Sequence, residues 1–79
     1  MALSKTYKFI EIRQVEHTES RPVYGVFNRK SQDHLGWLCY YSGWRQYVFN
    51  AENHYCVFND SCLRDVLDFM ALIKEADNG

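Results

Sequence analysis

Proline and glycine are scarce in this chain, which has one proline and four glycines among 79 residues. Flexible linkers and low-complexity regions rich in these residues are therefore absent, and no internal repeat is visible. The hydrophobic share of 47% and the net charge of −1 exclude a self-repelling disordered chain. We expect residues 1–79 to form a single small domain.

Long apolar runs are also missing. The longest, from Leu35 to Tyr41, has seven residues and includes Gly36, which is too short to cross a membrane. Residues 1–10 interleave lysines with aromatic residues and do not match the apolar core of a secretory signal. We therefore expect no membrane partner and a cytoplasmic location.

Cysteine is limited to three residues, and no two of them form a C-x-x-C pair. An odd number without paired spacing argues against a disulfide framework, so free thiols in a reducing compartment are expected. The spacing of His54, Cys56 and Cys62, with His34 or Cys39 as a fourth ligand, could be written as a zinc site. Without a knuckle that holds two thiolates in one turn the signal is weak, and we predict no metal.

Motifs of catalytic and cofactor sites are absent as well: the chain has no P-loop, dinucleotide, nucleophile-elbow or metalloprotease motif. A nucleophilic Cys–His pair would need spatial contact, which a sequence does not reveal. Asp65 and Asp68 are three residues apart, as on a solvated helix face. We predict that the protein is not an enzyme, with no catalytic residues and no cofactor.

Five segments show the alternation and the β-branched and aromatic content typical of strands. In the first, Tyr7 and Phe9 share one parity and Ile10 and Ile12 the other, so a bulge is expected where the phase slips. Short polar connections between the segments indicate hairpins. The expected strands are 6–15, 23–29, 35–41, 44–50 and 54–58.

The third and fourth expected strands carry much of the aromatic content. If Ser42 and Gly43 form a two-residue loop, Tyr41 pairs with Trp44. Trp37 then shares a face with Trp44, where the two rings fill a core or anchor an interface. That face would carry Leu35, Trp37, Cys39, Tyr41, Trp44 and Val48, and the other Leu38, Tyr40, Arg45, Tyr47 and Phe49.

An amphipathic helix is expected over residues 61–75, where apolar residues recur at spacings of three and four. Residues 59–61 precede it with side-chain oxygens suited to capping. The expected fold is α+β: an antiparallel meander of four to five strands with one C-terminal helix packed on one face. Because one helix covers one face, the second aromatic face must meet solvent, a second copy or a ligand.

The sequences at 24–37, 40–49 and 62–69, with the Trp-Arg-Gln-Tyr-x-Phe strand as the most specific part, resemble a group of small uncharacterised bacterial proteins. The resemblance implies a single-domain strand meander ending in a helix and a bacterial cytoplasmic setting, but no function. The group's pattern has a glycine where Gln32 stands and a polar residue near Leu38. The order of the expected elements, three strands followed by a helix, is also distantly similar to that of the plant-type DNA-binding domain of three strands and a helix.

Charge is divided unevenly: seven basic against four acidic residues through Val48, and two against six from Phe49 onward. We expect a non-catalytic module that binds protein, including itself as a homodimer, through an aromatic sheet face or an edge strand. The alternative is nucleic-acid binding by a basic, aromatic sheet face. The candidate binding residues are Arg29, Lys30, Tyr40, Arg45, Tyr47 and Phe49.

Overall fold

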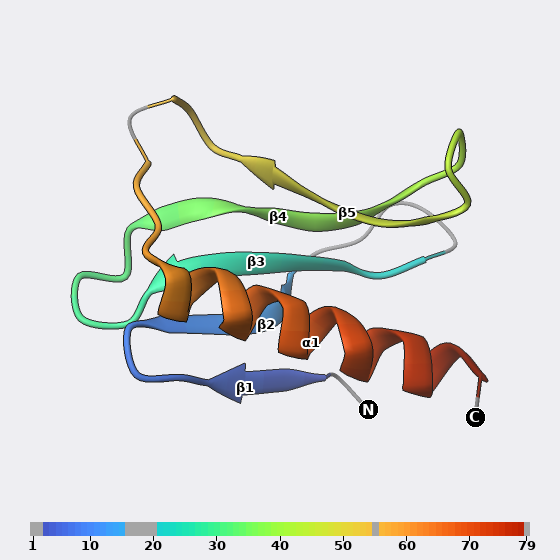
Figure 1. Cartoon of the computed structure of the whole chain (residues 1–79), viewed down its shortest axis with the longest axis horizontal. Helices are drawn as coiled ribbons and strands as arrows, with labels where there is room; N and C mark the ends of the chain where they lie inside the picture. The colour runs from blue at the N-terminus through green and yellow to red at the C-terminus, as the bar shows by residue number, and fades with distance from the viewer. Residues whose placement is uncertain (1–2, 16–20, 55, 79) are drawn as a thin grey trace.

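The computed structural model describes residues 3–15, 21–54 and 56–78. One antiparallel sheet runs in the order β1-β2-β3-β4-β5, and a C-terminal helix packs on one of its faces (Figure 1). The expected α+β meander is thus confirmed. The elements are β1 (Ser4–Thr6), β2 (Ile10–Val15), β3 (Val23–Asn28), β4 (His34–Tyr41), β5 (Gln46–Ala51) and α1 (Asp60–Asn78).

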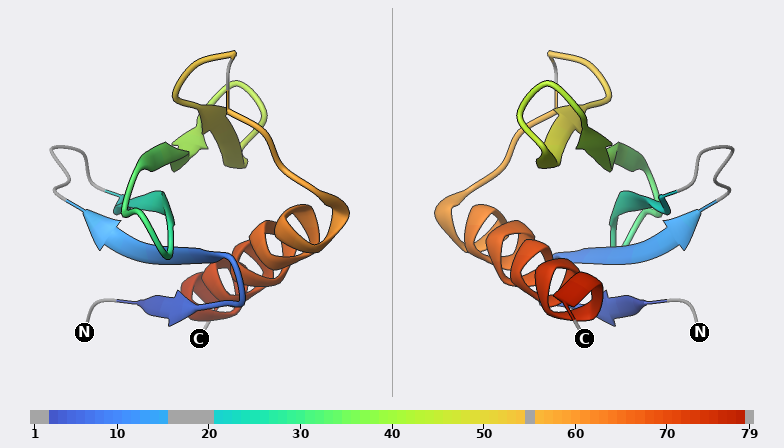
Figure 2. Two further views of the ribbon diagram at one scale, coloured as in Figure 1. Left: turned by 90° about the vertical axis from the view of Figure 1, so that its left-hand side faces the viewer. Right: turned by 90° about the vertical axis from the view of Figure 1, so that its right-hand side faces the viewer.

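The sheet curves around the helix, which lies on its concave side (Figure 2). Because the strands form a meander, alternate turns lie at opposite ends of the sheet. The β1–β2 and β3–β4 turns lie at the end where α1 begins, whereas the β4–β5 turn lies at the far end (Figure 1). We call the end with the first two turns the proximal end.

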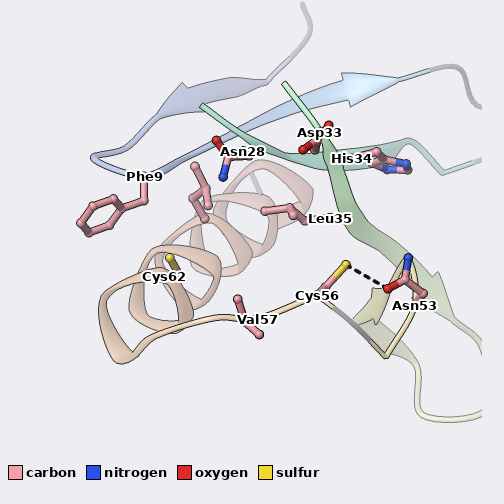
Figure 3. A pocket seen from close by; sticks show the side chains of 10 residues that line it. Phe9, Asn28, Asp33, His34, Leu35, Asn53, Cys56, Val57 and Cys62 are labelled. Atoms are coloured by element: carbon pink, nitrogen blue, oxygen red, sulfur yellow. Dashed lines mark hydrogen bonds between the residues drawn. The ribbon is translucent and has the colours of Figure 1, made fainter. Parts of the chain in front are cut away.

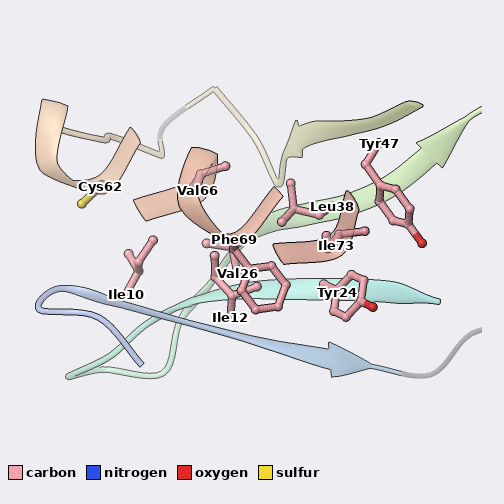
Figure 4. Close-up of a cluster of buried hydrophobic side chains, with 10 residues drawn as sticks. All are labelled: Ile10, Ile12, Tyr24, Val26, Leu38, Tyr47, Cys62, Val66, Phe69 and Ile73. Atoms are coloured by element: carbon pink, nitrogen blue, oxygen red, sulfur yellow. The ribbon is translucent and has the colours of Figure 1, made fainter. Parts of the chain in front are cut away.

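The hydrophobic core fills the space between the concave face and α1 (Figure 4). Phe69 is fully buried, and its ring meets that of Tyr24 edge-on, with 5.2 Å between centroids. Four helix positions at spacings of four, three and four supply one side of this core, as the sequence period predicts. The buried residues are Ile10, Ile12, Tyr24, Val26, Leu38, Tyr47, Cys62, Val66, Phe69 and Ile73.

The helix begins with the expected side-chain cap. Asn59 Oδ1 accepts a hydrogen bond of 2.8 Å from the amide of Cys62, and Asn59 O accepts one of 3.0 Å from the amide of Leu63. The first bond satisfies an amide that the first turn leaves without a helical partner, and the second is the first regular bond of the helix. The helix runs from Asp60 to Asn78, slightly longer at both ends than the expected 61–75.

The single strand predicted over 6–15 is wrong: this segment contains a tight hairpin. Thr6 ends β1 and pairs with Glu11, and the Tyr7 amide donates to Ile10 O at 2.8 Å to close the turn. The change of parity between Phe9 and Ile10 therefore marks a reversal of chain direction and not a bulge. The polar residue Lys8 at the tip fits this exposed position.

The strand predicted over 54–58 is also wrong for its described residues. Residues 56–59 have no regular secondary structure and carry the chain from β5 to α1. Their apolar side chains serve a different purpose: the Phe58 ring packs on Phe49 with 5.2 Å between centroids, whereas Val57 is 85% exposed. A short alternating pattern does not distinguish a strand from a connection that covers the core with one side chain.

The β4–β5 hairpin has a four-residue turn, so the predicted register is wrong by two residues. Tyr41 pairs with Gln46 instead of Trp44. A shift of two preserves the alternation of faces, so Trp37 and Cys39 stay together on the face away from α1. Leu35 is the exception, because a register irregularity between β3 and β4 turns it toward the core, where it packs.

Candidate interaction surfaces

The sheet face away from α1, here called the outer face, carries a row of stacked side chains across β2, β3 and β4. The Arg13 guanidinium carbon lies 3.8 Å from the centre of the Phe27 ring. Phe27 stacks on His34 with 5.0 Å between centroids, and His34 meets Trp37 edge-on at 4.8 Å. The described elements put no helix over this row (Figure 2).

His34 is held between these rings by an acidic neighbour. Its Nδ1 atom lies 3.3 Å from Glu52 Oε2, and Glu52 is in turn placed by a hydrogen bond of 2.8 Å from its amide to Leu35 O. The Nε2 atom is buried and has no hydrogen-bond partner within the described ranges. The imidazole therefore contributes chiefly a flat aromatic surface to the row.

The rim of the outer face is polar and of mixed sign. On the β2 side, Arg13 pairs with Glu11 at 3.4 Å, and Gln32 donates to Glu11 at 3.1 Å. Glu52 follows β5 at the opposite side of the sheet. An apolar centre thus lies between a margin that carries the Arg13–Glu11 pair and a margin that carries Glu52.

A glycine makes room for the Phe27 ring at the centre of this face. A Cβ atom on Gly25 would lie 2.6 Å from Phe27 Cε1 and 3.0 Å from Val15 Cγ1. The Phe27 ring therefore lies over the glycine backbone and leaves no room for another side chain.

The β4–β5 turn adds two exposed rings. Trp44 is 67% exposed and meets Tyr41 edge-on, with 5.2 Å between centroids. A shallow hollow of about 280 Å³ lies beside them, lined by Tyr41, Trp44, Val48, Phe49 and Asn50. The prediction that Trp44 shares a strand face with Trp37 is wrong, because Trp44 lies in the turn before β5 and belongs to neither strand of the hairpin.

The proximal end carries a second surface, a hollow of about 540 Å³ lined by Lys8, Phe9, Asn28, Arg29 and Lys30. Its two turns are bonded together: the Arg29 amide donates to Phe9 O at 2.9 Å, and the Arg29 guanidinium donates to Tyr7 O at 3.2 Å. Asn28 Oδ1 accepts from the amide of Lys30 at 3.0 Å, which fixes the start of the β3–β4 turn. This hollow is lined by three cationic side chains and no carboxylate.

A cleft of about 470 Å³ adjoins this hollow and shares Phe9 and Asn28 with it (Figure 3). It lies between the proximal turns, the connection after β5 and the first turn of α1. Its lining combines apolar side chains with a few polar groups and two thiols: Phe9, Ile10, Asn28, Asp33, His34, Leu35, Asn53, Cys56, Val57 and Cys62.

The six candidate binding residues do not form one surface. Arg29 and Lys30 lie at the proximal end, whereas Arg45 lies in the β4–β5 turn at the far end. The candidate binding residues Arg45, Tyr47 and Phe49 do not form an exposed patch, because Tyr47 is only 6% exposed and belongs to the core. Its hydroxyl donates to Pro22 O at 2.7 Å.

Tyr40 and Phe49 are half-buried and pack against the core on the concave side. The basic, aromatic sheet face expected for nucleic acid is therefore not present as a unit, since these rings face α1. Sequence reasoning missed Lys8 and Phe9, because it placed them inside a strand; the phase slip beside them was the available signal.

No family model, curated protein or solved structure matches this chain. Among the residues that the structure describes, no helix has the length and apolar character needed to cross a membrane. The same residues contain no group of three or more His, Cys, Asp or Glu side chains placed to hold a metal ion.

Proposed function

We propose that this protein is a non-catalytic interaction module whose outer face binds a second copy of the chain. The observation that supports this is the row of Phe27, His34 and Trp37 on a face that α1 leaves uncovered. Antiparallel sheets that face water on one side usually carry polar residues there. A domain of 79 residues also buries a limited core, so association adds burial that the monomer lacks.

In the proposed homodimer the two outer faces stack about a two-fold axis parallel to the strands. The faces are convex, so the contact centres on the crest at β3 and β4, where Phe27 and Trp37 lie. The axis brings the β2 margin of one protomer opposite the β5 margin of the other. Arg13, which pairs with Glu11 within its own protomer, then lies on the margin opposite Glu52 of the partner subunit, and exchanging Glu11 for that carboxylate would join the two margins.

A reducing cytoplasm is part of this proposal, because Cys39, Cys56 and Cys62 are all free. Structural disulfides are typical of oxidising compartments and rare in the cytosol. The bacterial setting is also part of the proposal and is supported by the sequence resemblance alone.

Light scattering coupled to size-exclusion chromatography tests the homodimer. The wild-type protein should have twice the monomer mass at high micromolar concentration, and Trp37→Glu should return it to the monomer mass. Leu67→Glu is the matched control: Leu67 is 65% exposed on α1, away from the outer face, so its mass should not change. A monomeric wild type, or equal effects of both substitutions, would refute the proposal.

A charge exchange tests the relative orientation of the two copies. Arg13→Glu and Glu52→Arg should each weaken the dimer, because each places like charges across the margin. The double substitution should restore dimerisation. If the double variant dimerises no better than the single variants, the parallel two-fold arrangement is wrong. Far-UV circular dichroism confirms that each variant remains folded.

A further inference from the structure

We infer that the proximal end binds a nucleotide unit, with its phosphate among Lys8, Arg29 and Lys30 and its base in the adjoining cleft. The hollow of about 540 Å³ supplies the cations, and the cleft of about 470 Å³ supplies a largely apolar recess. The hollow and Phe9 lie outside the row of Phe27, His34 and Trp37, and the cleft shares only His34 with that row. The cations and the stacking ring are therefore separate from the residues that test the proposed dimer.

The three cations are available to an anion. Within the described ranges none of Lys8, Arg29 and Lys30 forms an ion pair with a carboxylate, although four other ion pairs occur there. The Arg29 guanidinium is oriented by its bond to Tyr7 O, and the Asn28 bond to the Lys30 amide fixes the backbone from which the Lys30 side chain extends. Positioned cations of this kind bind phosphate oxygens through charge-assisted hydrogen bonds.

Phe9 supplies the stacking surface. It is 43% exposed, lines both the hollow and the cleft, and lies beneath Lys8, whose Nζ is 5.2 Å from the ring centre. An exposed ring next to cations is the combination that single-stranded nucleic acids use, because every base has a face that stacks.

The cleft beyond Phe9 suits the edge of a base. Leu35 and Val57 give it apolar walls, while Asn28 and Asp33 bring polar groups to it (Figure 3). The Asp33 carboxylate would accept a hydrogen bond from an exocyclic amino group. It would repel a phosphate, so the phosphate belongs on the cationic side of Asn28.

Overall charge does not favour such binding, because the chain carries a net charge of −1. The attraction is therefore local, and we expect binding to be seen at low salt and to weaken steeply as salt increases. The bound unit is either a free mononucleotide or one nucleotide of a single strand, because both would make the same contacts at this site.

Chemical-shift mapping of the ¹⁵N-labelled protein at low salt tests this inference, with AMP, a single-stranded oligoadenylate and inorganic phosphate as separate probes. AMP should shift the amides of the two proximal turns. A clearly lower Kd for the oligoadenylate assigns the site to a strand, and an equal Kd assigns it to the free nucleotide. Inorganic phosphate should bind more weakly than AMP. If phosphate shifts the same amides as strongly as AMP does, the base makes no contact with the site and the inference is overturned.

Substitutions separate the two contributions. Phe9→Ala should raise the Kd for AMP about tenfold, the loss of one stacked base. Lys8→Ala with Lys30→Ala should raise the Kd and flatten its dependence on salt. Lys74→Ala is the control, since Lys74 is an exposed lysine on α1, away from the proximal end.

Three further results would overturn the inference: no shift of the proximal amides with any probe, shifts centred elsewhere, or a loss of affinity in Lys74→Ala equal to that of the proximal variants. The first two mean that the site is not a ligand site. The third means that the attraction is a general effect of charge.

Discussion

The hydroxyl of Tyr7 donates a hydrogen bond of 2.7 Å to Asp68 Oδ2, which joins the residue after β1 to the middle of α1. Lys5 Nζ reaches the same oxygen at 2.9 Å. Burial, and then the hydrogen bond to Asp68, raise the pKa of Tyr7 above its ordinary value. The hydrogen bonds from Tyr7 and then from Lys5 lower the pKa of Asp68.

These shifts predict how Tyr7→Phe changes stability with pH. The lowered pKa of Asp68 adds a contribution to folding stability that is fully present above the unfolded aspartate pKa of about 3.9. This contribution is lost as the pH falls through the folded pKa. The raised pKa of Tyr7 adds a contribution to stability that is fully present below the unfolded tyrosine pKa of about 10. This contribution is lost as the pH rises toward the folded pKa. The Tm of the wild type should therefore be higher than that of Tyr7→Phe mainly at pH values between these two unfolded pKa values.

Thermal unfolding followed by circular dichroism across this pH range measures the difference. Tyr41→Phe is the control, because Tyr41 is 47% exposed at the far end of the sheet and should show little difference at any pH. A Tm difference for Tyr7→Phe that stays constant from acid to alkaline pH would contradict the assignment.

Asn59→Ala should lower the free energy of unfolding by about 1 kcal/mol, because it removes the side-chain acceptor for the Cys62 amide. Asn59→Ser keeps a capping oxygen and should recover most of the loss. Urea denaturation measures both variants, with an unchanged m-value expected. If Asn59→Ala and Asn59→Ser lower the free energy of unfolding equally, the capping oxygen contributes nothing to stability.

Gly36→Ala should destabilise the fold by about 1 to 3 kcal/mol, since the new methyl group overpacks a filled site. A Cβ at this position would collide with the backbone oxygen of Asn50, and the Phe49 ring lies 2.8 Å away. Urea denaturation measures this loss of stability. Ala51→Gly is the control for the effect of a glycine in this hairpin. A stability equal to the wild type would mean that β4 and β5 can separate at no cost.

Arg45→Gly should stabilise the protein by about 1 kcal/mol. Arg45 adopts a φ of 55°, a left-handed conformation that costs a non-glycine residue about that much. Ser42→Gly in the same turn is the control and should give no gain, because Ser42 is not among the residues with positive φ. A loss of stability for Arg45→Gly, measured by urea denaturation, would contradict the strain.

The sequence predicts well what depends on local periodicity. The helix, its Asn59 cap and the strands around Val26 and Leu38 follow from residues close in the chain. Gln32 adopts a φ of 66°, a conformation that glycine enters more readily than other residues, and no periodicity in the sequence reveals it. Leu38 is fully buried in the core, in keeping with its place in an alternating strand.

Other features depend on contacts that no local pattern contains. Two turns distant in sequence form the proximal end, and their closeness follows from the order of the whole sheet. Ser42 and Gly43 suit a two-residue loop, but the β4–β5 turn has four residues and it is Arg45 that adopts the left-handed conformation. The face of Tyr47 was predicted correctly, but which face α1 would cover depended on tertiary packing.

The meander order has a consequence for how the chain folds. Each strand pairs with its predecessor in sequence, so hairpins can form one after another as the chain leaves the ribosome. The contact of Lys5 and Tyr7 with Asp68 spans more than sixty residues and forms only after α1 has docked. These contacts tie the first strand to the helix, and a chain in which α1 has not docked would leave the apolar concave face open to chaperones and to other chains.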